Sequence, residues 1–155
     1  MSSKTVRDAI KNYLSSTHPT ENIIDITEEI EDLQDLIEGA GLVYQEDAWL
    51  GIDFIGFDEY PIDVLVTNTT GKYREEGVLM IYVVEAVNKQ DVMNPRDRIL
   101  VRAENILNSL RGKRLNGVVI ERLTTPNFQA GSNLQFEGNY VSAMLSATFH
   151  FDKIL

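Results

Sequence analysis

The sequence predicts a single α+β domain over residues 1–155, with a mainly antiparallel β-sheet of about five strands packed against a long helix and additional N-terminal helices. Three observations predict this fold class. Capped segments with helical apolar spacing occur near the N-terminus, strand-like runs with short links follow, and a wide apolar helical face begins at Asn94-Pro95. Consecutive strands with short links favour antiparallel pairing.

Two helices are predicted before the first strand. The first is capped by Ser3 or Thr5 and should end before His18-Pro19, because proline disfavours the helical conformation of the preceding residue. The second runs from Thr27 to Glu38. The buried positions are Val6, Ile10, Tyr13 and Leu14 in the first helix and Ile30, Leu33 and Ile37 in the second. The second helix also has an acidic face, formed by Glu28, Glu31, Asp32, Asp35 and Glu38.

Three strands are predicted next. Trp49 to Phe57 forms the first and Ile62 to Thr67 the second, with a turn at residues 58–61 that contains Pro61. A polar loop over residues 69–77 leads into the third strand, Val78 to Val87. This strand is apolar on both faces, which places it centrally in the sheet.

The C-terminal half continues with a helix from Asn94-Pro95 to Gly112 and a strand from Gly117 to Leu123. A long polar loop, Thr125 to Asn139, precedes the last strand. In that strand apolar residues alternate with polar ones, and Met144 is the exception; the apolar set is Val141, Ala143, Leu145, Ala147, Phe149 and Phe151.

The charge is unevenly distributed along the chain. Residues 1–71 carry 15 acidic and three basic side chains, whereas residues 72–155 carry nine acidic and eleven basic ones. With a net charge of −10, the chain lacks the dominant basic surface that is expected of a free nucleic-acid-binding protein. The absence of cysteine excludes disulfides, thiol nucleophiles and cysteine-ligated metals. The N-terminus is polar and no apolar run approaches the length of a membrane span, so we expect a cytoplasmic protein unless it leaves in a larger particle.

The sequence contains no motif that indicates catalysis. It lacks phosphate-binding GxxxxGK[ST] and GxGxxG patterns and the GxSxG elbow, and His18 and His150 lack metal-ligand spacing. We therefore predict no catalytic, cofactor-binding or metal site and no enzymatic activity. Acidic residues on or near strands could in principle pair as acid and base, although solvated carboxylates are the commoner case: Asp53, Asp58, Asp63 and Glu85.

The acidic helix predicts a subunit interface, with a solvated face as the alternative interpretation. Glu31, Asp32 and Asp35 would contact Arg98 and Arg102 of a neighbouring copy, or its Arg111 to Arg114 cluster. Opposite patches on one chain can meet head to tail, and such a contact forms a ring when it closes.

The order of the predicted elements and their residue patterns resemble those of the tail terminator (tail completion) proteins of tailed bacteriophages. The resemblance covers nearly the whole chain and lies in a few segments, none of them specific alone. They are the N-terminal helix at 6–14, a strand pair broken by Tyr60-Pro61-Ile62-Asp63, the apolar strand after Gly77, the helix at 103–110, Gly117-Val118-Val119-Ile120, and the late strand 140–149. The acidic second helix departs from this pattern.

The resemblance implies a structural virion protein, a homohexameric ring that caps the tail tube, stops its polymerisation and joins the tail to the head. Its partners would be further copies of itself, the tail tube protein and head-completion or neck proteins. DNA would pass through the lumen without specific binding, which suits a net negative protein. Two alternatives remain: another phage neck or tail-tube protein, and a small ligand-binding domain or enzyme that uses Asp53, Asp63 or Glu85.

The loop from Thr125 to Asn139 generates a first prediction. Phe128, Leu134 and Phe136 would be costly to leave in water, so we expect them to order against a neighbouring subunit or the tail tube. Replacing residues 127–136 with a short Gly-Ser linker should leave a folded monomer that forms no rings. Circular dichroism and analytical ultracentrifugation measure both properties, and normal assembly of the shortened protein would show that the loop is dispensable.

Overall fold

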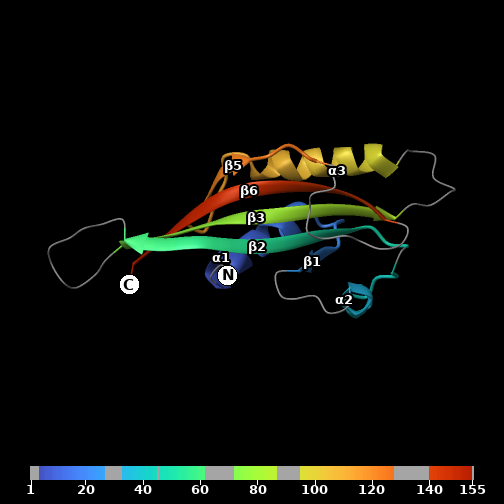
Figure 1. Cartoon of the computed structure of the whole chain (residues 1–155), viewed down its shortest axis with the longest axis horizontal. Helices are drawn as coiled ribbons and strands as arrows, with labels where there is room; N and C mark the ends of the chain where they lie inside the picture. The colour runs from blue at the N-terminus through green and yellow to red at the C-terminus, as the bar shows by residue number, and fades with distance from the viewer. Residues whose placement is uncertain are drawn as a thin grey trace.

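The computed structural model of the protein describes residues 4–26, 33–44, 46–61, 72–86, 95–127 and 140–154 (Figure 1). Along the chain, the described elements are α1 (Lys4–Thr17), β1 (Ile23–Asp25), α2 (Leu33–Gly39), β2 (Trp49–Pro61), β3 (Lys72–Ala86), α3 (Pro95–Leu110), β4 (Arg114–Leu115), β5 (Val118–Leu123) and β6 (Tyr140–Ile154).

The strands form one curled sheet in the order β1-β2-β3-β6-β5-β4 (Figure 1). β1 pairs with β2 in parallel, and every other pairing in this order is antiparallel. The prediction of an α+β fold with a mainly antiparallel sheet is confirmed. The described sheet has six strands: four of the five predicted ones and two short strands, β1 and β4, that the sequence analysis did not predict. β3 occupies a central position, as its apolar sequence predicted.

One face of the sheet, which we call the α1/α3 face, carries the larger hydrophobic cluster. Buried residues of α1 and α3 share this cluster with alternate residues of the strands. The apolar set predicted for β6 is confirmed, because Ala143, Leu145, Ala147 and Phe149 are all buried here, with Val141 and Phe151 packed against them. The helical residues of the cluster are Val6, Ala9, Ile10, Leu14, Ile99, Ala103, Ile106, Leu107 and Leu110.

The opposite face, which we call the α2 face, carries a smaller cluster at one end of the sheet. Ile37 of α2 is buried there with Trp49 of β2 and Tyr82 of β3. Met144, the exception in the β6 alternation, packs against this cluster, which gives a physical reason for an apolar residue among polar neighbours. The Trp49 and Tyr140 rings meet edge to face, with centroids 6.4 Å apart.

The helix ends follow the predicted signals where they are described. α1 ends at Thr17, immediately before His18-Pro19. α3 begins at Pro95 and ends at Leu110, and Gly112 follows it with φ 60°, a left-handed conformation that glycine adopts without strain. The predicted start of the second helix, residues 27–32, lies outside the described residues, and α2 is described from Leu33 to Gly39.

The predicted turn at residues 58–61 and the predicted loop over residues 69–77 are both corrected by the structure. β2 continues to Pro61 and β3 already begins at Lys72, so the two strands pair along their polar ends. Cross-strand polar contacts hold this extension together, which an apolar pattern could not reveal. Tyr60 Oη donates to Glu76 at 2.7 Å, Arg74 Nε lies 2.7 Å from Asp152 of β6, and Lys153 Nζ lies 2.9 Å from Glu59. The predicted strand Ile62 to Thr67 lies outside the described residues.

A tight hairpin joins β4 to β5 and places basic residues at the edge of the sheet. Its two central residues are Asn116, with φ 50°, and Gly117, with φ 88°. Asn-Gly is the preferred pair for a two-residue hairpin turn with positive φ at both positions. This signal is present in the sequence and would have predicted β4.

Gly77 generates a prediction about packing. A Cβ at this position would lie 2.4 Å from the Ile55 carbonyl oxygen and 2.6 Å from the Phe149 ring. Backbone and a buried ring must both shift, so Gly77→Ala should lower the free energy of unfolding by about 1–3 kcal/mol. Urea unfolding measures this, with Gly39→Ala as the control, because a Cβ at Gly39 meets nothing within 4 Å. Equal midpoints for the two variants would contradict the prediction.

Candidate assembly surfaces

The charge asymmetry of the sequence becomes a separation between the two edges of the sheet. The acidic half of the chain supplies β1, α2 and β2 at one edge, and no Lys or Arg occurs between Lys11 and Lys72. At the other edge, the segment from the end of α3 through β5 carries Arg111, Lys113, Arg114 and Arg122 against Glu121 alone. We call these the acidic edge and the basic edge.

Several carboxylates of the acidic edge are exposed to solvent. Asp35, a predicted interface residue, is exposed on α2, as is Glu38. Asp58 and Glu59 are exposed near the far end of β2. Two predicted interface residues, Glu31 and Asp32, lie outside the described residues.

The basic edge is exposed, and no acidic side chain of the described residues forms an ion pair with it. Arg111, Lys113, Arg114 and Arg122 are all exposed. Arg111 Nε donates to Asn108 Oδ1 at 3.3 Å, but none of the four forms an ion pair within the part of the chain that the structure describes. The edge is therefore available for an acidic partner. The predicted loop contacts Phe128, Leu134 and Phe136 lie outside the described residues, and Asn127 before them forms a β-bridge with Met144.

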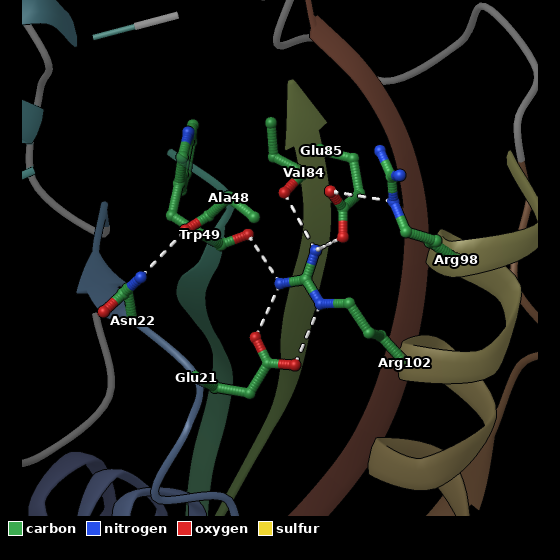
Figure 2. Close-up of polar contacts among 8 residues, drawn as sticks. All are labelled: Glu21, Asn22, Ala48, Trp49, Val84, Glu85, Arg98 and Arg102. Carbon is green, nitrogen blue, oxygen red and sulfur yellow. Dashed lines mark hydrogen bonds and ion pairs between the residues drawn. The ribbon is translucent and has the colours of Figure 1, made fainter. Parts of the chain in front are cut away.

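Arg102, predicted to contact a neighbouring subunit, forms an ion network inside its own chain (Figure 2). Its guanidinium donates two hydrogen bonds to the Glu21 carboxylate, from Nε at 2.9 Å and from Nη2 at 2.6 Å. Nη1 donates to Glu85 at 3.0 Å and to the Val84 carbonyl at 2.9 Å, and Nη2 also donates to the Trp49 carbonyl at 3.2 Å. A guanidinium has five N–H donors, and all five are used.

All five donors of Arg102 are therefore engaged within its own chain, and its predicted contact with a neighbouring copy stays a prediction. Its side chain is only 17% exposed, and those of Glu21 and Glu85 are similarly covered. Burial lowers the pKa of the Arg102 guanidinium, but the hydrogen bonds and charges of Glu21 and Glu85 more than offset this and raise it. Arg98 lies beside the same cluster, with Nε 3.5 Å from Glu85 (Figure 2). Its predicted contact with a neighbouring copy stays a prediction.

A sequence signal for this network existed. Glu85 lies in the most apolar strand of the chain, and a buried carboxylate requires a cation and hydrogen-bond donors. Arg98 and Arg102 each directly precede a buried residue of α3, Ile99 or Ala103, which puts them at the border of the buried helix face. Together these positions indicate an internal ion network.

Two of the predicted strand carboxylates, Asp53 and Glu85, lie on opposite faces of the sheet. Asp53 alternates with the buried α1/α3-face residues Ile52 and Phe54 and so lies on the α2 face, whereas Glu85 contacts α3 on the opposite face. Burial, and then the charge of Asp25, raises the pKa of Asp53. Asp63 lies outside the described residues. Within the described ranges, no three His, Asp or Glu side chains are grouped to hold a metal ion.

The two histidines have contacts within the chain. His18 follows α1, as the predicted helix end before His18-Pro19 requires, and its Nε2 lies 2.8 Å from Ser109 Oγ. His150 of β6 contacts Glu121 of β5. Both contacts join strands or helices that are distant in sequence.

Comparisons with known proteins assign no family. No model of a known protein family matches the chain, and no curated protein matches it. One solved structure is similar over 98% of this chain and 95% of the other, at 12% sequence identity and a TM-score of 0.41. A similarity this weak supports no inference. In the described part of the chain, no helix is long and apolar enough to cross a membrane.

The Arg102 network generates a prediction about stability. Arg102→Met leaves Glu21 and Glu85 buried without their main cation, and breaking such a network should lower the free energy of unfolding by about 3–5 kcal/mol. The exposed Arg111→Met control should change it by less than about 0.5 kcal/mol. Thermal and urea unfolding measure both. If Arg102→Met does not fold, Arg102→Lys, which keeps the charge, serves in its place; its free energy of unfolding should lie between those of the other two variants. Equal stability of all three variants would contradict the network's role.

Proposed function

We propose that this chain is a structural protein of a bacteriophage tail, a ring-forming tail terminator that caps the tail tube, stops its polymerisation and provides the head-tail joining interface. The observation that carries the proposal is the placement of acidic and basic residues at opposite edges of one sheet. With this arrangement, the acidic edge of one copy is complementary to the basic edge of a second copy. Neither edge is complementary to the same edge of another copy.

Head-to-tail contact follows from this arrangement. A twofold dimer would bring acidic edge against acidic edge or basic against basic, and like charges across an interface are costly. A heterologous contact instead brings opposite charges together, and it produces a ring when the rotation between copies closes. The resemblance of the element order to tail terminators supports closure as a hexamer.

The proposal places the protein in the virion tail or neck, and in the host cytoplasm during assembly. Its neighbours would be the tail tube protein on one side of the ring and head-completion or neck proteins on the other. A net charge of −10 suits a ring through which DNA passes, because a basic lumen would retain the phosphates. In this proposal the protein catalyses no reaction and needs no cofactor.

The test measures assembly directly. Mass photometry and analytical ultracentrifugation over a wide concentration range should detect a ring, with a hexamer as the expected species. Because exposed charges are screened above about 0.1 M salt, the ring should dissociate more readily at high ionic strength. Negative-stain imaging distinguishes closed rings from open stacks, and stacking into tubes would identify a tube protein instead. A strict monomer that also fails to bind tail tubes would overturn the proposal.

A further inference from the structure

A single cross-strand row of residues connects the acidic edge to the basic edge. Asp58 of β2 pairs in register with Glu76 of β3, and Glu76 pairs with His150 of β6. His150 pairs with Val119 of β5, and Val119 pairs with Arg114 of β4. Directly opposed residues of antiparallel strands point to the same side of a sheet, so all five lie on the α2 face.

The two ends of this row carry opposite charges and are both exposed. Asp58 accepts a hydrogen bond from its neighbour's backbone, Glu59 N, at 3.1 Å, and neither Asp58 nor Arg114 forms an ion pair among the described residues. Within the row, Glu76 accepts a hydrogen bond from the neutral Tyr60 hydroxyl, and His150 contacts Glu121. The two ends of the row therefore carry opposite charges that form no ion pair among the described residues.

We infer that Asp58 of one copy pairs with Arg114 of a second copy, so that the row continues from one sheet to the next. The inference rests on the proposed head-to-tail assembly and specifies its contact. Side-by-side placement of two copies at the same height along the strands brings these two residues together. Lys113, exposed next to Arg114, adds a second positive charge at the same point.

The acidic helix does not fit the basic edge in the same way. α2 packs against Trp49, at the opposite end of β2 from Asp58. Nine residues of strand separate the two positions, which corresponds to about 30 Å. Along the strand direction, Asp35 and Glu38 therefore lie far from the cross-strand row that contains Arg114. The contact predicted from the sequence would require the second copy to be displaced along the strands.

The contact is made by side chains and not by backbone strand addition. β2 has a register irregularity between Gly56 and Asp58, carries Asp58 and Glu59, and ends in Pro61. Bulges, charges and proline are the features that protect a sheet edge from pairing with another strand. At the other edge, β4 is only two residues long.

Cysteine trapping tests the contact in the full-length protein, which has no native cysteine. Asp58 and Arg114 lie four inter-strand spacings apart in the same sheet, roughly 19 Å, so a D58C/R114C chain has no internal disulfide within reach. Mild oxidation should give a ladder of linked subunits up to the ring. A mixture of D58C and R114C single variants should stop at the dimer. The matched D35C/R114C chain should give no ladder.

Charge reversal provides an independent test. D58K or R114E alone places like charges at each contact and should weaken self-association by about tenfold or more. An equimolar mixture of the two variants should assemble again, because each reversed residue then faces the reversed residue of the other variant. Mixed rings would alternate strictly. D35K changes charge equally on α2 and should leave self-association unchanged.

The outcomes separate this inference from the proposed function. If the wild-type chain forms rings but D58C/R114C gives no ladder and the reversal mixture does not recover, the contact is wrong and the ring stands. A D35C/R114C ladder would transfer the contact to α2 and overturn the inference. Self-linkage of R114C alone would show a twofold interface, and a wild-type chain that never associates would overturn both proposals.

Discussion

The five hydrogen bonds of the Arg102 guanidinium determine where four separate segments meet. They join α3 to Glu21 in the link between α1 and β1, to the start of β2 and to the end of β3. Two of the acceptors are backbone carbonyls, which ties the position of the main chain itself to this side chain. Removing two carboxylates and a guanidinium from water is costly, and only complete pairing of their donors and acceptors offsets that cost. The bidentate grip on Glu21 provides the required geometry.

This constraint also explains why the basic residues of the C-terminal half have different roles. Arg98 and Arg102 lie where α3 approaches the end of β3, and both pair with Glu85 of the same chain. Arg111, Lys113 and Arg114 come after the last buried turn of α3, and none of them forms an ion pair among the described residues. These five basic residues count equally toward the net charge, but burial separates them. Arg98 and Arg102 stabilise the fold, whereas Arg111, Lys113 and Arg114 remain on the surface.

The sequence predicted those elements whose signals are local and repeated. The alternation of β6, the Pro95 start of α3 and the stop before Pro19 all depend on neighbouring residues, and the structure confirms them. The extension of β2 to Pro61 depends instead on partners in β3 and β6, such as Glu76 and Lys153, that are distant in sequence. β1 is held by parallel pairing with β2, and a strand of three residues is too short for a periodic pattern. For the candidate site, sequence revealed the charge separation, but not the cross-strand register that decides which acid faces which base.

An open sheet with two edges must avoid indiscriminate pairing if its assembly is to stop at a defined size. Here both edges are closed to backbone addition, by a two-residue strand at one side and by the irregularity, acids and Pro61 at the other. Charged side chains at those edges repel their own kind and attract the opposite edge, which makes the preferred association directional. Directional contacts produce either a ring or an endless helix, according to the angle between copies. The curl of the sheet gives each copy an intrinsic angle between its edges (Figure 1), and that angle, more than the strength of any single ion pair, decides whether the assembly closes.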